Sequence, residues 1–292
     1  CAVEEAEQAA TSTVTLPSEN LKSRIIGKEG RNVRTFENAT GVKVVVDDTP
    51  DTVLLSSFDP LKREVAAKAM ERLIKDGGFT PAHIESVVTE AKSELDHEME
   101  DAGRKALNEI GAADYHPDLP ASLGRLKFRS SYGQNQLQHC LEVAQLTGLM
   151  ATDIGLDVAL AKRAGLLHDI GKGLNHEAEG THGENGADLA RKFGEAPIVV
   201  NAIEAHHGES DPISPVAVLV DAADIISRSR PGAQREVLEN YVRRLERLES
   251  IAKMIEGVEA VYAIKAGQEV RVIADCEMMS DADTEKLATQ IA

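Results

Sequence analysis

The sequence predicts a multidomain protein with an α+β domain at the N-terminus, a helical connector, an all-α domain and a small α/β C-terminal unit. Strand and helix periodicities alternate up to residue 78, and helical periodicity then dominates residues 135–228. The chain has 292 residues, whereas a single domain usually has roughly 100–200. Hydrophobic residues make up 42% and charged residues 28%, which is typical of a soluble globular protein and excludes wholesale disorder.

The N-terminal region is expected to contain elements in the order β-α-α-β-β-α. Threonines alternate with aliphatic residues in the first strand. Asp59 and Pro60 form a typical cap and first turn for the last helix, and Gly77-Gly78 ends it. The expected elements are strands at 11–16, 42–46 and 52–56, and helices at 17–26, 31–40 and 60–76.

A long charged helix at 81–110 is expected to act as a connector, and residues 116–129 are expected to form a loop or short-helix boundary. The C-terminal elements are expected to be helices at 235–255 and 281–291 and strands at 258–264 and 269–274. The predicted domains are a tail at 1–10, the α+β domain at 11–78, the connector at 79–115, the all-α domain at 116–234 and the C-terminal unit at 235–292. Because the chain starts at Cys1 without Met, we expect a fragment whose C-terminal unit is cut short.

The overall charge is acidic, with 32 Lys and Arg against 49 Asp and Glu and a net charge of -17. A nucleic-acid-binding domain is normally basic, so this balance argues against one unless basic residues gather locally. Cys1, Cys140 and Cys276 are too few and too scattered for a disulfide framework, so we expect reduced thiols and an intracellular protein. No apolar run approaches the about 20 residues of a transmembrane helix.

A glycine loop provides the local basic cluster. Glycines allow the backbone to approach a ligand closely and to adopt positive φ, and amide groups at the start of the next helix can contact phosphate. Gly-x-x-Gly alone could be a structural connector, but here it lies between two helices of the expected β-α-α-β-β-α order, which resembles a type I KH domain. That resemblance implies binding of about four nucleotides of single strand; a KH fold used as a protein-binding module is the alternative. The expected RNA-binding residues are Arg24, Gly27, Lys28, Glu29, Gly30 and Arg31.

A second motif consists of adjacent His168 and Asp169, which follow an apolar helix and precede Gly171. An imidazole and a carboxylate side by side can chelate a divalent ion. Together with His139 on an earlier helix and Asp224 on a later one, the pair resembles the HD phosphohydrolase superfamily, and the resemblance implies an all-helical metal-binding domain. These ligand types suit Mn, Fe, Zn, Ni or Mg.

Further histidines resemble those of the two-metal branch of that superfamily. The resemblance implies that His182, His206 and His207 hold a second ion and that Asp169 bridges the two. Two ions can clamp the attacking and leaving oxygens of a phosphodiester. Lys172 lies where a catalytic cation could stabilise charge on phosphate. The pattern leaves open whether one or two ions bind, and whether His176 replaces His182.

The succession of KH segment, helical connector and HD segment resembles the ribonuclease Y family of bacterial endoribonucleases, which initiate messenger RNA decay. The stretches that carry the resemblance are 24–32, 125–135, 163–172, 222–233 and 238–245. The resemblance implies cleavage of single-stranded RNA, a homo-oligomer (a dimer) and RNA-degradation partners. It also implies a cytoplasmic location, with the parent protein anchored at the inner face of the membrane by a segment ahead of residue 1. No membrane contact is expected from the 292 residues themselves.

We expect water activated by a divalent metal to attack phosphorus, which leaves a 5′-phosphate and a 3′-hydroxyl. Two other functions are compatible with the residues. A cyclic-dinucleotide or nucleotide phosphodiesterase would use the same ligands, although the Gly-Tyr-Pro signature of that branch is absent from the sequence. A non-catalytic RNA-binding scaffold would not need the metal ligands, so the intact set His139, His168, Asp169 and Asp224 argues against it.

Overall fold

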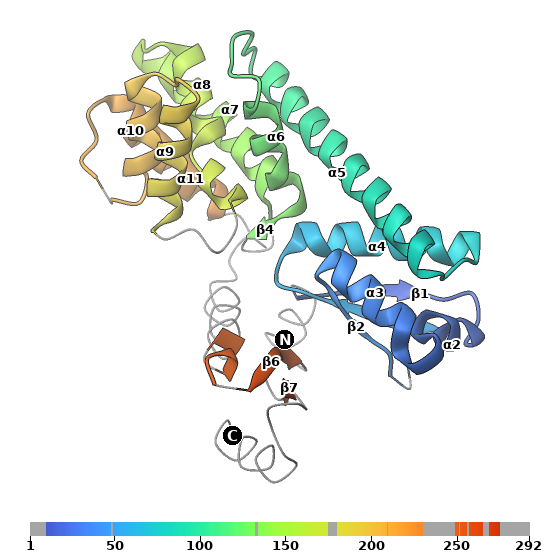
Figure 1. Cartoon of the computed structure of the whole chain (residues 1–292). Helices are drawn as coiled ribbons and strands as arrows, with labels where there is room; N and C mark the ends of the chain where they lie inside the picture. The colour runs from blue at the N-terminus through green and yellow to red at the C-terminus, as the bar shows by residue number, and fades with distance from the viewer. Residues whose placement is uncertain are drawn as a thin grey trace. The chain divides into compact units, whose positions relative to one another are not determined.

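The computed structural model describes residues 10–47, 49–131, 134–174, 180–208, 210–229, 249–250, 252–255, 257–264 and 269–274 (Figure 1). The chain divides into two compact units. One is Thr13–Gln234, and the other combines Cys1–Ser12 with Arg235–Ala292. Among the described residues, no helix is both long enough and apolar enough to cross a membrane.

The N-terminal α+β region has the expected order of elements. Its sheet has the strand order β1-β3-β2, and β2 pairs antiparallel with β3 so that Val44 lies opposite Leu55. The first helix begins at Asn20 and not at residue 17, because the amides of Leu21 and Lys22 still bond three residues back, as in a turn. The elements are β1 (Thr11–Thr15), α2 (Asn20–Ile26), η1 (Lys28–Gly30), α3 (Arg31–Thr40), β2 (Lys43–Val45), β3 (Thr52–Ser56) and α4 (Pro60–Asp76).

The connector is a single helix, α5 (Pro81–Glu109), as its sequence predicts. Apolar side chains from its first two-thirds, from Ile84 to Met99, belong to the core of the α+β region. Ala106 and Leu107 near its end belong to the core of the helical region. Burying one such large aliphatic side chain stabilises the fold by about 2 kcal/mol. The connector is therefore part of both hydrophobic cores.

The helices of the helical region lie side by side (Figure 1). Their buried apolar side chains form one core. Side-chain caps explain where its principal helices begin: Asn135, Asp157 and Thr181 each accept a hydrogen bond from a backbone amide in the following turn. The segment 116–129 contains two short helical pieces, and a two-stranded ladder that the sequence did not predict follows it. The elements are α6 (Leu119–Gly124), η2 (Arg125–Phe128), β4 (Ser130–Ser131), β5 (Gln134–Asn135), α7 (Gln136–Ile154), α8 (Val158–Leu167), η3 (Ile170–Gly173), α9 (His182–Lys192), α10 (Pro197–Ala205) and α11 (Pro215–Arg228).

The C-terminal unit contains the two expected strands, β6 (Val258–Ile264) and β7 (Glu269–Ala274), paired antiparallel. The expected helix at 281–291 and most of the expected helix at 235–255 lie outside the described residues.

Candidate metal centre and glycine loop

Five helical segments bring the predicted metal ligands together. One ligand lies in the first turn of α7, two lie at the end of α8, one opens α9, two follow α10 and one lies within α11. They form two groups of side chains whose ligand atoms lie within 4.8 Å of one another. We call them the inner group, which is His139, His168 and Asp224, and the outer group, which is Asp169, His182, His206 and His207. His176, the alternative to His182, lies outside the described residues.

A glycine allows the His-Asp pair to approach α9. A Cβ atom at Gly171 would lie 2.0 Å from the carbonyl oxygen of His182 and 2.7 Å from the amide nitrogen of Gly186. Any larger residue would push η3 away from α9. A Cβ atom at Gly186 would lie 3.1 Å from the amide nitrogen of Gly171, so the second glycine of His-x-x-x-Gly serves the same close approach of η3 and α9.

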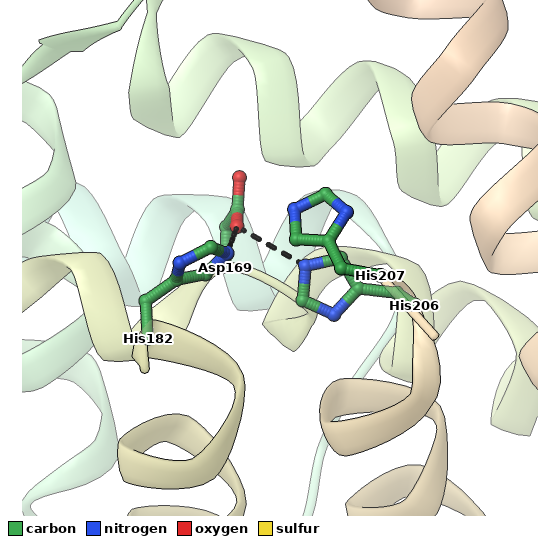
Figure 2. Close-up of side chains that lie close together, drawn as sticks. All are labelled: Asp169, His182, His206 and His207. Atoms are coloured by element: carbon green, nitrogen blue, oxygen red, sulfur yellow. Dashed lines mark ion pairs between the residues drawn. The ribbon is translucent and has the colours of Figure 1, made fainter. Parts of the chain in front are cut away.

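Asp169 faces both groups with different oxygens. Its Oδ1 lies 3.4 Å from His182 Nε2 and 3.5 Å from His206 Nε2, as the dashed lines in Figure 2 show. Its Oδ2 lies 3.2 Å from His168 Nε2 and 3.7 Å from His139 Nε2. This carboxylate has the arrangement expected of a ligand that bridges two ions.

The inner group is buried and converges on one carboxylate oxygen. Asp224 Oδ1 lies 3.0 Å from His139 Nε2 and 3.7 Å from His168 Nε2. No residue of the inner group is more than 4% exposed. The outer group is buried at Asp169 and His206, but His182 is half-buried and His207 is exposed. The centre therefore opens to solvent on the side of His182 and His207.

Hydrogen bonds at Nδ1 fix the tautomers of three histidines. His168 Nδ1 donates to the Gly165 carbonyl at 2.8 Å, and His206 Nδ1 donates to the Ile203 carbonyl at 2.6 Å, because a carbonyl can only accept. His139 Nδ1 lies 2.9 Å from the hydroxyl of Ser227, which in turn donates to Glu142 Oε2 at 2.8 Å. The hydroxyl proton of Ser227 points to Glu142, so the Ser227 oxygen accepts a hydrogen bond from the Nδ1–H of His139.

With a proton on Nδ1, the Nε2 atoms of these three rings face the centre, and each can offer a lone pair to a cation when the ring is neutral. The Nε2 atoms of His139, His168, His182 and His206 are buried and have no hydrogen-bond partner among the residues that the structure describes. Asp169 Oδ1 is in the same situation. Several buried acceptors without donors are costly unless a cation satisfies them. The residues therefore fit divalent ions held by imidazole and carboxylate, which is the usual chemistry of such sites.

The charges around the centre favour an ionised carboxylate and a neutral outer histidine. Burial opposes ionisation of Asp169, but Lys172 and His168 outweigh it and hold the pKa of Asp169 well below its usual range. Burial lowers the pKa of His182 to about 3, which keeps its ring neutral at physiological pH. Burial also opposes protonation of His168, but the Asp169 carboxylate raises the pKa of His168 well above its usual value, so an ion that binds there would displace the proton of the ring.

Lys172 lies where the sequence predicts a cation, with Nζ 2.8 Å from Asp169 Oδ2. Four other residues of the centre were not identified from the sequence. Gln136 donates to Asp169 Oδ2 at 2.6 Å, and Arg228 Nε lies 2.8 Å from Asp224 Oδ1. Ser227 and Glu142 are the other two. All four stand three or four residues from His139 or Asp224 on the same helices, which is the one signal that the sequence offers.

The glycine loop between α2 and α3 brings the predicted RNA-binding residues together at a different place. Gly27 and Gly30 have φ of 71° and 73°, and Glu29 between them also has a positive φ of 55°. A side chain at Gly27 would collide with Asn32, whose Cγ lies 2.6 Å from the position of the Cβ, whereas at Gly30 the nearest atom is 3.9 Å away. The cationic side chains of the loop are exposed; they are Arg24, Lys28, Arg31 and Arg34.

Comparison with protein families matches residues 11–72 to the KH domain and residues 137–229 to the HD domain. The glycine loop lies in the first match, and all seven residues of the two metal-ligand groups lie in the second. The resemblance to these two domains that the sequence suggests is therefore confirmed.

Curated relatives match the chain over its whole length. Ribonuclease Y of Geobacillus kaustophilus is 52% identical over 291 residues, and the ribonucleases Y of Bacillus licheniformis and Enterococcus faecalis are each 51% identical over 291 residues. These alignments cover 100% of this chain and 56% of each relative. The chain thus spans about half the length of the relatives that it matches.

Proposed function

Because the chain combines a KH domain with an HD domain and is related to ribonuclease Y along its whole length, we propose that it is a metal-dependent endoribonuclease that hydrolyses single-stranded RNA and initiates messenger RNA decay. The observation that carries the proposal is the position of the Asp169 carboxylate between the inner and the outer group. Its two oxygens face two groups of ligand atoms, as a two-metal phosphodiesterase requires.

In this proposal the inner group and Asp169 hold one ion, and the outer group holds the second. Bound ions would activate a water molecule at neutral pH and neutralise charge on the phosphate. The excess of imidazole over carboxylate favours Mn, Fe or Zn over Mg, which prefers oxygen ligands. The buried inner group excludes bulk water, so the phosphate would approach from the side of His182 and His207.

Lys172 and Gln136 both contact Oδ2 of Asp169, so we propose that they hold this carboxylate in its bridging orientation. The ammonium group of Lys172 adds a positive charge that would stabilise charge on the attacked phosphate. Attack by water, as opposed to the neighbouring 2′-hydroxyl, would leave a 5′-phosphate and a 3′-hydroxyl.

The glycine loop would hold single-stranded RNA that flanks the cleavage site and feed it to the metal centre. We propose that the backbone at Gly27, Lys28, Glu29 and Gly30 approaches phosphates, while the exposed cations Arg24, Lys28 and Arg31 attract them. Each of these contacts is reachable from solvent, whereas the acidic surface elsewhere disfavours unspecific binding of nucleic acid.

The relation to ribonuclease Y also supports proposals about the cellular context. We propose a cytoplasmic protein that forms homodimers and works with RNA-degradation partners, and a parent protein held at the inner face of the cell membrane. Co-purification of the full-length parent with the membrane fraction would test the last point.

The proposed function is tested with 5′-labelled single-stranded RNA and Mn²⁺. A second RNA carries a 2′-deoxy residue at the cleavage position. We expect internal cleavage of both RNAs, with 5′-phosphate and 3′-hydroxyl ends. A 2′,3′-cyclic phosphate would contradict attack by water. Binding without cleavage would favour an RNA-binding scaffold, and hydrolysis of a cyclic dinucleotide alone would favour the phosphodiesterase alternative.

A further inference from the structure

Arg228, the last residue of α11, lies against both metal-ligand groups. Its Nε lies 2.8 Å from Asp224 Oδ1 in the inner group. One of its terminal nitrogens lies 3.3 Å from His207 Nε2 and 3.8 Å from Asp169 Oδ2, which belong to the outer group. Lys172, by contrast, pairs with Asp169 alone among the described carboxylates.

The contact with Asp224 involves the same oxygen that faces His139 and His168. Asp224 Oδ1 lies 3.0 Å from His139 Nε2, so an ion held by these atoms would lie close to the guanidinium. An arginine remains charged at all accessible pH values, and repulsion between nearby like charges is strong in a partly buried site. Arg228 and a metal ion therefore compete for Asp224.

Once Arg228 has released Asp224, its guanidinium group is able to bind another anion. Its side chain is 26% exposed and lies on the same side of the centre as the exposed His207. A guanidinium presents a planar fork of donors that matches the oxygens of phosphate. An arginine at this edge can therefore turn from a ligand carboxylate to an incoming phosphate.

We propose that Arg228 couples metal loading to phosphate binding. In the metal-free protein it pairs with Asp224 and opposes entry of the ion. In the metal-loaded protein it releases Asp224 and binds a non-bridging oxygen of the phosphate group. The proposal rests on the proposed function for the identity of the substrate, and it makes Arg228 a substrate-positioning residue.

The first measurement is calorimetric titration of the full chain with Mn²⁺, which requires no RNA cleavage. Arg228→Gln removes the competing charge, so it should bind Mn²⁺ about tenfold more tightly than the unmodified protein. Arg228→Lys keeps the charge and should bind Mn²⁺ less tightly than Arg228→Gln. The matched control is Arg104→Gln, because Arg104 also pairs with a carboxylate on its own helix, that of Glu100, but belongs to the connector. The control should leave the affinity for Mn²⁺ unchanged.

The second measurement is binding of adenosine 5′-monophosphate to the Mn²⁺-saturated proteins. Loss of a charge-assisted contact to phosphate should weaken binding to Arg228→Gln about tenfold. Arg228→Lys should recover part of the loss, and Arg104→Gln should bind as the unmodified protein does. Thermal unfolding of each variant shows whether it is folded.

Opposite signs for the two ligands would support the proposal, since an arginine with a purely structural role would weaken both. Unchanged or weaker Mn²⁺ binding by folded Arg228→Gln would overturn it, and so would undiminished binding of adenosine 5′-monophosphate. Absence of RNA cleavage by the unmodified protein would reject the proposed function, while both titrations would still report on Arg228.

Discussion

The glycine loop and the metal centre differ in how the chain holds their functional groups. The cations of the loop are exposed, and its shape depends on the positive φ of Gly27, Glu29 and Gly30. In the metal centre, His139, His168 and His206 are buried, and each is fixed by a hydrogen bond on the opposite ring nitrogen. Exposed contacts to phosphate are weakened by salt, whereas buried ligands act as a unit. From this difference we expect the loop to contribute affinity for RNA in small increments and the centre to depend on every ligand.

The strongest test of this difference is Asp169→Asn. The change keeps the shape and removes the charge that faces both ligand groups, so RNA cleavage should fall on the order of a thousandfold or more. Binding of single-stranded RNA should change little if the loop supplies most of the affinity. Asp188→Asn is the matched control, because the Asp188 side chain is 75% exposed and pairs with Arg191. Cleavage near the normal rate by metal-saturated Asp169→Asn would refute the mechanism.

A second test compares two neighbouring histidines of the outer group. His206 is buried and its ring is fixed by the Ile203 carbonyl, whereas His207 is exposed. Both Ala variants should bind about one equivalent of Mn²⁺ fewer and lose most activity, with the larger loss, about a hundredfold, for His206→Ala. His83→Ala provides the control, since His83 pairs with Asp76 in the α+β region. An unchanged metal stoichiometry in both variants would favour a one-metal site.

A third test concerns the support of His139. Ser227→Ala removes the hydroxyl between His139 and Glu142 and leaves the ring free to change its tautomer or orientation. Removing such a supporting contact typically lowers metal affinity by about 10–100-fold. Ser229→Ala is the matched control, because that hydroxyl bonds only to the backbone of its own helix among the contacts described. Equal Mn²⁺ affinities of the two variants would show that the hydroxyl does not position His139.

The smallest effect is expected for the glycine loop. Gly30→Asp adds a carboxylate where the nearest atoms leave room. Because this carboxylate repels phosphate, binding of long single-stranded RNA should weaken by about tenfold or less, and it should depend less on the salt concentration. Gly27→Asp is less informative, because its side chain would displace Asn32, which donates to the Arg24 carbonyl. Gly155→Asp is the matched control. Gly155 has the same φ of 73° as Gly30, so the substitution has a similar backbone cost, and no described atom lies within 4 Å of the added Cβ.

Cleavage of a short RNA by Gly30→Asp is the control for the binding measurement with long RNA. An oligonucleotide that reaches the metal centre alone should be cut by Gly30→Asp at the normal rate. Equal loss on short and long RNA would mean that the loop supports the helical region structurally. Undiminished binding of long RNA would mean that the loop contacts protein.

The sequence predicts which residues meet in the centre, because the HD pattern fixes their types and their order along the chain. The structure brings together His139, His168, Asp169 and Asp224 from separate helices, as the resemblance to HD proteins implies. Strand positions were also predictable, and β6 and β7 have the expected bounds. In both cases the information is local in the sequence or carried by a fixed pattern.

The remaining features depend on contacts between segments far apart in the chain. Ser227 and Glu142 are 85 residues apart, and nothing in the sequence indicates that the two side chains meet. Arg228 looks like an ordinary basic residue at a helix C-terminus, where cations are common. The need for glycine at 171 arises from the carbonyl of His182 and is visible only once η3 and α9 are packed.

The shared helix α5 has a consequence for how the protein unfolds. Its apolar side chains complete two cores. Loss of the α+β core would expose the buried residues from Ile84 to Met99 to water, and loss of the helical core would expose Ala106 and Leu107. The α+β region and the helical region should therefore unfold in a single cooperative thermal transition, and not as two independent domains. A proteolytic cut within α5 would leave two pieces, each with a hydrophobic seam that invites aggregation.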